Sequence, residues 1–255
     1  MTKFKINNKN FCFNEIPNTD DKEVLEFLVY LQELYDICRN LLLNLAEENK
    51  KIKTTIGFVG SIIDRISESI ISIILLSSKG FSRDVAIILV NIIELRTDLK
   101  YISNKPEKIE EWFNHKNLNK KPWKISHQIK EIVNSEEELK REKNIYEICS
   151  IAKHGNPAGY DTGFNIGLKG NGIFIYPNNN NSKLPIYLYW TFVYISDSIK
   201  SSLNIVSKFS IEPSKILNDL EEVSKKVNVL SSRIISNEIM DYINKSNLEL
   251  RNNGN

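Results

Sequence analysis

Apolar residues recur every three or four positions over most of the chain, which is the spacing of one face of an α-helix. The pattern predicts helices over residues 20–48, 54–79 and 82–99, and Gly80 stops the second of them. Because the connections between these helices are short, we expect them to pack as an antiparallel up-down-up unit.

The same spacing continues after a break. Pro106 begins a shorter helix that includes Trp112, and Ser135 with Glu138 forms a capping box for a helix that ends at His154. Helical spacing returns over residues 184–209, and again after Pro213 to about residue 243.

One segment departs from this pattern. Residues 155–183 contain six glycines, and FNIGLKGNGIFIY alternates apolar and small residues about Gly170, Asn171 and Gly172. Such alternation around a turn that needs positive φ is typical of a β-hairpin. The sequence therefore predicts a mostly-α protein, a bundle of about six to eight helices with one small β-hairpin after the His154 helix.

No linker is long enough to divide the chain, so we expect a single helical domain over residues 1–255. Its predicted parts are an N-terminal arm (1–19), a helical core (20–154), a glycine-rich loop and hairpin (155–183), two C-terminal helices (184–245) and a disordered tail (246–255).

Composition indicates a cytoplasmic location. The three cysteines are odd in number and widely spaced, which favours reduced core residues over disulfides. The first residues contain no uninterrupted apolar segment of the kind that forms a secretory signal. The most apolar stretch, residues 56–76, is interrupted by Asp64, Arg65 and Glu68, so we expect no membrane association.

His154 is the first candidate catalytic residue, because it ends a helix immediately before Gly155 and Pro157 and titrates near neutral pH. Glu94 is the second, since a carboxylate on a buried helix can orient a histidine. Asn91 and Arg96 on the same helix are candidate ligand-binding residues. The alternatives are a histidine that caps the last carbonyls and a polar network that fixes helix register.

A lysine-rich run forms the second candidate site. Residues 114–130 contain five lysines and no acidic residue. Lysines beside an aromatic ring suit a phosphate backbone with a base to stack, although such runs also occur in solvated loops. The candidate nucleic-acid-binding residues are Lys116, Lys120, Lys121, Trp123, Lys124 and His127.

Metal and cofactor sites are not expected. The histidines show no HxxxH or HExxH spacing, and the glycines show no phosphate-binding order.

Two segments, SIILLSSKGFSRDVAIILVNIIELRTDLKYI and YEICSIAKHGNP, together resemble a bacterial family of all-helical proteins of unknown function that looks related to the HEPN superfamily. The resemblance spans roughly residues 55–160. The matching residues are Gly80, Glu94, Tyr146, Ser150, His154 and Gly155. The resemblance implies that Tyr146 and Ser150 belong with His154 in a ligand-binding site.

The chain departs from the catalytic pattern of HEPN ribonucleases, an arginine followed after four to six residues by histidine. No arginine stands in that window before His154, and Arg141 is thirteen residues upstream. Asn91 also stands where the related pattern tends to have an arginine.

The resemblance therefore implies a HEPN-like module that dimerises and binds a partner in bacterial stress, toxin–antitoxin or phage-defence biology. A homodimer would bring two copies of His154 together across a two-fold axis. The first alternative is a divergent metal-independent ribonuclease, with RNA or a nucleotide as ligand, that uses His154. The second is a structural partner of a protein from a neighbouring gene, with no site of its own.

Overall fold

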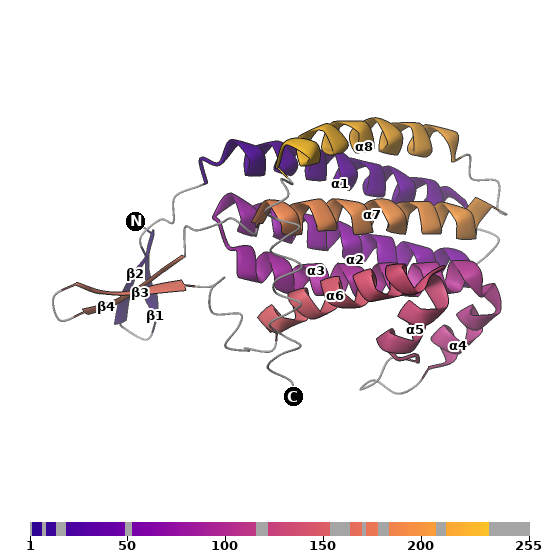
Figure 1. Ribbon diagram of the computed structural model, residues 1–255, viewed down its shortest axis with the longest axis horizontal. Coiled ribbons are helices and arrows are strands. Elements are labelled where there is room, and N and C mark those ends of the chain that lie inside the picture. Colours follow the sequence, from indigo (N-terminus) through magenta and orange to yellow (C-terminus); the bar gives the residue numbers. More distant parts are fainter. Residues whose placement is uncertain are drawn as a thin grey trace.

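The computed structural model describes residues 2–6, 9–13, 19–48, 53–115, 122–153, 164–169, 172–177, 184–207 and 213–234. Most of these residues lie in eight α-helices, which confirms the predicted mostly-α bundle (Figure 1). No helix within the described ranges is both long enough and apolar enough to cross a membrane.

The first three helices are α1 (Lys22–Glu48), α2 (Lys53–Ser78) and α3 (Ser82–Asn104). The Asp21 carboxylate caps α1 by accepting hydrogen bonds from the amides of Glu23 and Val24. Gly80 connects α2 to α3 with a φ of 75°, a conformation that residues with a Cβ rarely adopt.

The antiparallel arrangement of these helices is confirmed by pairs of contacts. The Thr19 amide, just before α1, donates to the Ser78 carbonyl at the end of α2. Asn91, nine residues after the start of α3, places its Nδ2 3.4 Å from the Oγ of Ser69, which lies nine residues before the end of α2.

The next segment is more helical than its lysines and Pro122 predict. A 3₁₀ turn (η1, Pro106–Lys108) leads into α4 (Ile109–Asn114). The expected loop region contains a further helix, α5 (Ile125–Ile132), because Ile129 and Ile132 give it a buried face.

Helix α6 (Glu136–Lys153) begins with a variant of the predicted capping box. Ser135 Oγ accepts from the Glu138 amide, and the Glu138 carboxylate accepts from the Asn134 amide, one residue before the expected position.

Helices α7 (Leu184–Val206) and α8 (Ser214–Ile234) complete the bundle. In Figure 1, α7 lies between α8 and α6, and residues on most of its circumference are buried. It contacts α1, α2, α3 and α8. Residues 235–245, the predicted end of the last helix, lie outside the described residues.

The described residues also include antiparallel pairs of short strands. β1 (Thr2–Ile6) runs antiparallel to β2 (Lys9–Phe13), a pairing that the predicted N-terminal arm did not include. β3 (Phe164–Lys169) runs antiparallel to β4 (Gly172–Pro177). The predicted turn at residues 170–171 lies outside the described residues and stays a prediction.

Two of the three cysteines are buried and free, as their apolar surroundings predict. Burial raises the pKa of the Cys38 thiol to about 12 and raises that of Cys149 as well, so neither thiol forms the reactive thiolate near neutral pH. The side chain of Cys12 lies outside the described residues.

Candidate functional site

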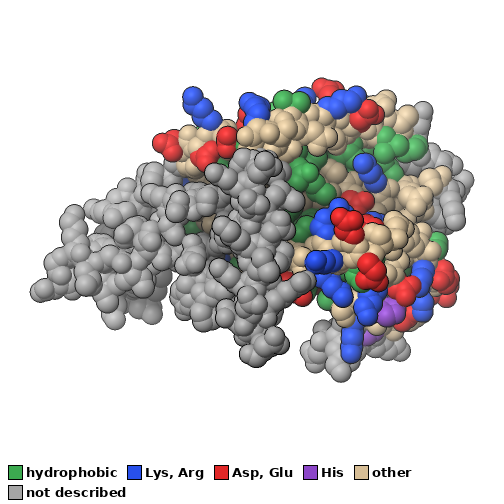
Figure 2. Space-filling model, viewed as in Figure 1, with side chains coloured by type: hydrophobic (Ala, Val, Ile, Leu, Met, Phe, Trp, Pro, Cys, Tyr) green, Lys and Arg blue, Asp and Glu red, His purple; other side chains and the backbone are tan. Residues whose placement is uncertain are grey.

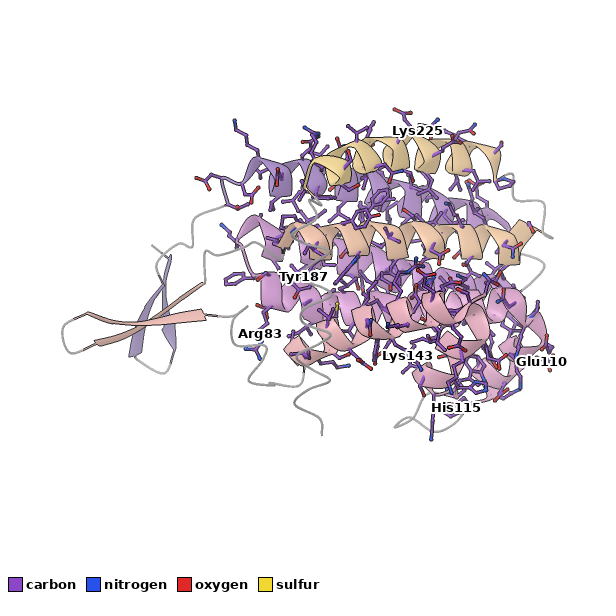
Figure 3. The ribbon with its side chains drawn as sticks, in the orientation of Figure 1. Arg83, Glu110, His115, Lys143, Tyr187 and Lys225 are labelled. Carbon is purple, nitrogen blue, oxygen red and sulfur yellow. The ribbon has the colours of Figure 1, made fainter. Side chains whose placement is uncertain are left out.

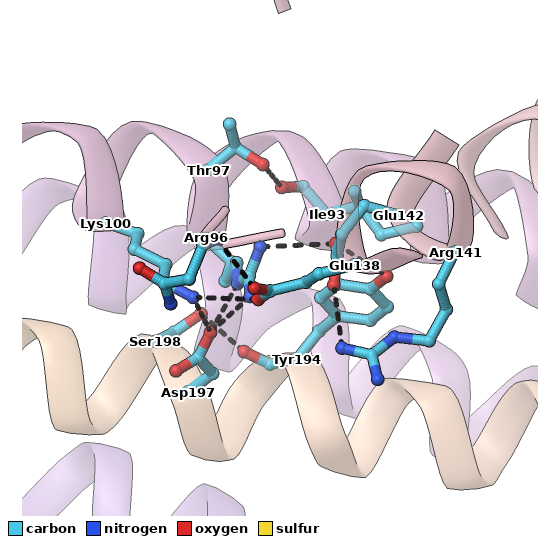
Figure 4. A network of polar contacts seen from close by, with 11 residues as sticks. Ile93, Arg96, Thr97, Lys100, Glu138, Arg141, Glu142, Tyr194, Asp197 and Ser198 are labelled. Carbon is cyan, nitrogen blue, oxygen red and sulfur yellow. Dashed lines mark hydrogen bonds and ion pairs between the residues drawn. The ribbon is translucent and has the colours of Figure 1, made fainter. Parts of the chain in front are cut away.

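A buried arginine lies where α3, α6 and α7 meet (Figure 4). Arg96 of α3 is only 5% exposed. Its Nε and Nη2 atoms each lie 2.5 Å from Asp197 Oδ2 of α7, and its Nη1 lies 3.3 Å from Glu142 Oε2 of α6. Because Glu142 is 4% exposed, both charges of the Arg96–Glu142 pair are almost fully removed from water.

Tyr194 of α7 is the fourth member of this arginine network. Its hydroxyl donates to Glu142 Oε2 at 3.0 Å, and its ring lies 5.3 Å from the Arg96 guanidinium carbon. Burial and the nearby charge of Glu142 hold the pKa of Tyr194 well above its usual value. Tyr194 therefore stays protonated and donates to the carboxylate rather than acting as a base.

Looser charges border the arginine network. Lys100 Nζ lies 3.9 Å from Glu138 Oε1 and 3.8 Å from Asp197 Oδ2, and Arg141 Nη2 lies 3.9 Å from Glu142 Oε1. Figure 2 shows basic and acidic side chains side by side over this part of the surface. These residues also line a cavity of about 520 Å³ between α3, α6, α7 and α8.

The two predicted residues of α3 that flank this region contact different helices. Glu94 Oε1 accepts from the Tyr146 hydroxyl of α6 at 3.1 Å. Burial raises the pKa of Tyr146, and the nearby charge of Glu94 raises it further. Asn91 instead faces α2, where it contacts Ser69 and lies 3.5 Å from Arg65 Nη2. Asn91 and Glu94 are therefore not brought into one site by direct contact.

Ser150 lies one turn after Tyr146 on α6, and its buried hydroxyl has no hydrogen-bond partner among the described residues. The side chain of His154 lies outside the described residues, so its predicted partnership with Glu94 stays a prediction.

An arginine from another helix reaches the end of α6. Arg83, in the first turn of α3, places Nε 3.4 Å and Nη2 3.5 Å from the Ala152 carbonyl oxygen (Figure 3). This contact is long, and it is typical of a basic side chain that interacts with the last carbonyls of a helix. Ala152 is two residues before His154.

The lysine-rich candidate site differs from its prediction at the aromatic residue. Trp123 is 9% exposed and packs on Tyr101 with ring centroids 5.0 Å apart, so its ring faces the core rather than a stacked base. The reason is that the chain after Pro122 folds back against α3, and the indole covers apolar surface there.

Lys124 and His127 are exposed, as a nucleic-acid contact requires, but His127 Nε2 lies 3.8 Å from Glu131. Glu131 also pairs with Lys105, so acidic charge offsets part of the basic run. Lys116, Lys120 and Lys121 lie outside the described residues.

The sequence indicates Arg96 as a candidate ligand-binding residue, a role that stays a prediction, but it does not point to the partners Glu142, Tyr194 and Asp197. A signal for Asp197 was present, because it interrupts the apolar stretch WTFVYISDSI on a helix that reads as buried. Glu142 offered no such signal, since it lies in a charged helix where an acidic residue normally faces solvent.

Comparison with family models, with characterised proteins and with solved structures found no match to this chain.

Replacing Arg96 with alanine tests the energetic role of the arginine network. We expect a loss of ~3–5 kcal/mol in the free energy of unfolding, because Glu142 would remain buried without its counter-charge. Urea denaturation followed by circular dichroism measures the change.

Arg141→Ala is the matched control, because it removes an exposed arginine that touches the same glutamate. We expect it to change the free energy of unfolding by less than ~0.5 kcal/mol. Equal effects of the two substitutions would contradict a special role for the buried guanidinium.

Proposed function

We propose that this chain is a HEPN-like helical module that forms a homodimer and acts by binding a partner, in bacterial stress or phage defence. The observation that supports dimerisation is a set of exposed apolar side chains at one end of the α1–α2 pair. Leu25 and Val29 of α1 and Ile71 and Leu75 of α2 are between 42% and 63% exposed. The biological setting rests on the sequence resemblance.

The positions of these four residues favour one interacting surface. Leu25 and Val29 are four residues apart and so share one face of α1, and Ile71 and Leu75 share one face of α2 in the same way. Because α1 and α2 are antiparallel and Thr19 contacts Ser78, both pairs lie at the same end of the two helices. Single exposed leucines are common, but a group of them favours a protein contact.

Leu75→Glu tests this surface. We expect the wild-type chain to be a dimer at micromolar concentration and the variant to dissociate at least about tenfold more easily, because a charge would be buried in the interface. Sedimentation velocity over a range of protein concentrations measures the dimer dissociation constant.

Leu43→Glu is the control, because Leu43 has a similar exposure of 58% but lies near the opposite end of α1. A monomeric wild type, or equal dissociation of the two variants, would reject the proposed surface.

A second candidate function is a divergent metal-independent ribonuclease. Such an enzyme needs a cation to stabilise the charge of the transition state and a histidine to transfer the proton. The sequence offers no arginine in the window before His154, but Arg83 reaches the Ala152 carbonyl from a different helix. Arg83 is therefore the candidate cation for this reaction.

Cleavage of a labelled RNA pool in the presence of a chelator tests this candidate. We expect His154→Ala and Arg83→Ala each to lower the cleavage rate by at least ~100-fold, and Arg83→Lys to retain part of it. Lys153→Ala is the control, because it removes an exposed cation from the same end of α6. Absence of cleavage by the wild type would reject the ribonuclease and leave the binding module.

A further inference from the structure

The cavity that the arginine network lines has the size of a small-molecule binding site. It measures about 520 Å³ and is bordered by four helices, α3, α6, α7 and α8. Binding sites for small ligands commonly lie between helices of a bundle and have volumes of roughly 300–1,000 Å³.

The charged side chains that line the cavity differ in how closely they are paired with opposite charges. The carboxylates of Glu142 and Asp197 are engaged by the buried guanidinium of Arg96, and Glu142 also accepts from Tyr194. The lining also contains three further cations, one on each of three helices: Lys100 (α3), Arg141 (α6) and Lys200 (α7).

These three cations retain donors for a ligand. Lys100 and Arg141 approach their carboxylates no closer than 3.8 Å, which is beyond hydrogen-bonding distance. Lys200 is exposed and forms no direct ion pair with another of the described residues, although its charge adds to that of Lys225 in lowering the pKa of the Glu221 carboxyl. Together with Arg96, these three cations outnumber the three carboxylates of the lining, Glu138, Glu142 and Asp197, so the lining favours a compact negative charge.

A buried hydroxyl in the same lining is without a partner. Ser196 is 6% exposed, and its Oγ makes no hydrogen bond within the described part of the chain. Its neighbours on α7 behave differently, since Thr191 and Ser198 each donate to the carbonyl four residues earlier at 2.7 Å. A buried hydroxyl without a partner costs free energy. The Ser196 Oγ has almost no accessible surface, so a rotation of this side chain toward the cavity would let a ligand supply the missing bond.

The rest of the lining is apolar and aromatic, with Tyr189, Trp190 and Phe192 contributing from α7. We propose that this cavity binds a small phosphate monoester, with the phosphate held by Lys100, Arg141, Lys200 and the Ser196 hydroxyl and the apolar body against the aromatic side chains. Phosphate fits the lining because it offers several acceptor oxygens to donors from different helices. The site is independent of the proposed dimer.

Isothermal titration calorimetry with phenyl phosphate tests the proposal, with inorganic phosphate and phenol as the two partial ligands. We expect phenyl phosphate to bind more tightly than either, and its affinity to fall as salt rises. Lys200→Met and Ser196→Ala should each weaken binding, by about tenfold and about fivefold, because each removes a donor.

Two substitutions serve as controls for these variants. Ser202→Ala removes another buried hydroxyl of α7 that also lacks a described partner but does not line the cavity. Lys225→Met removes an exposed lysine of α8 that pairs with Glu221. Neither should change the affinity.

Three results would overturn the site: no binding of phenyl phosphate, binding that Lys200→Met and Ser196→Ala leave unchanged, or equal loss in the Ser202→Ala control. Equal affinities for inorganic phosphate and phenyl phosphate would overturn the assignment of an apolar body to the ligand.

Discussion

A guanidinium inside a helical bundle requires permanent neutralisation, because arginine does not lose its proton in proteins. Arg96 is such a group, and its counter-charges come from two other helices, Glu142 of α6 and Asp197 of α7. A shift of either helix by one turn along α3, about 5.4 Å, would remove one of the two counter-charges of the buried guanidinium. The packing of three helices in this register therefore depends on one ion cluster. Apolar side chains alone tolerate sliding and repacking more easily.

This register also arranges the two regions to which we assign functions. Helices α3 and α6 are antiparallel, with contacts that pair Arg96 with Glu142, Glu94 with Tyr146 and Arg83 with Ala152. The proposed phosphate cavity lies at the first of these contacts and the candidate cation of the ribonuclease at the last. They are thirteen residues apart on α3, roughly 20 Å along the helix axis. The two proposed sites therefore use different turns of α3.

The helical spacing of apolar residues was sufficient to predict the long helices, because residues at this spacing form one apolar face that packs against the core. Asp21 and Gly80 mark helix ends through local geometry, which the sequence also indicates. Trp123 is an exception, because its environment depends on a contact distant in the chain. Its lysine neighbours indicate an exposed loop, yet its ring packs on Tyr101, some twenty residues earlier in the chain. The partners of Arg96 were missed for the same reason. Glu142 and Asp197 are 46 and 101 residues away from it, and spacing within one helix carries no information about such distant contacts.

A double-mutant cycle between Arg96 and Glu142 tests the central role of the ion cluster most directly. Arg96→Met and Glu142→Leu replace each charge with an apolar side chain, and the free energy of unfolding is measured for both single variants and for the pair. We predict that the double variant loses less free energy of unfolding than the sum of the two single losses, by at least ~2 kcal/mol. Each single variant leaves one buried charge without its partner, whereas the double variant removes both charges. Additive losses would contradict the account, since they would mean that the two charges do not depend on each other.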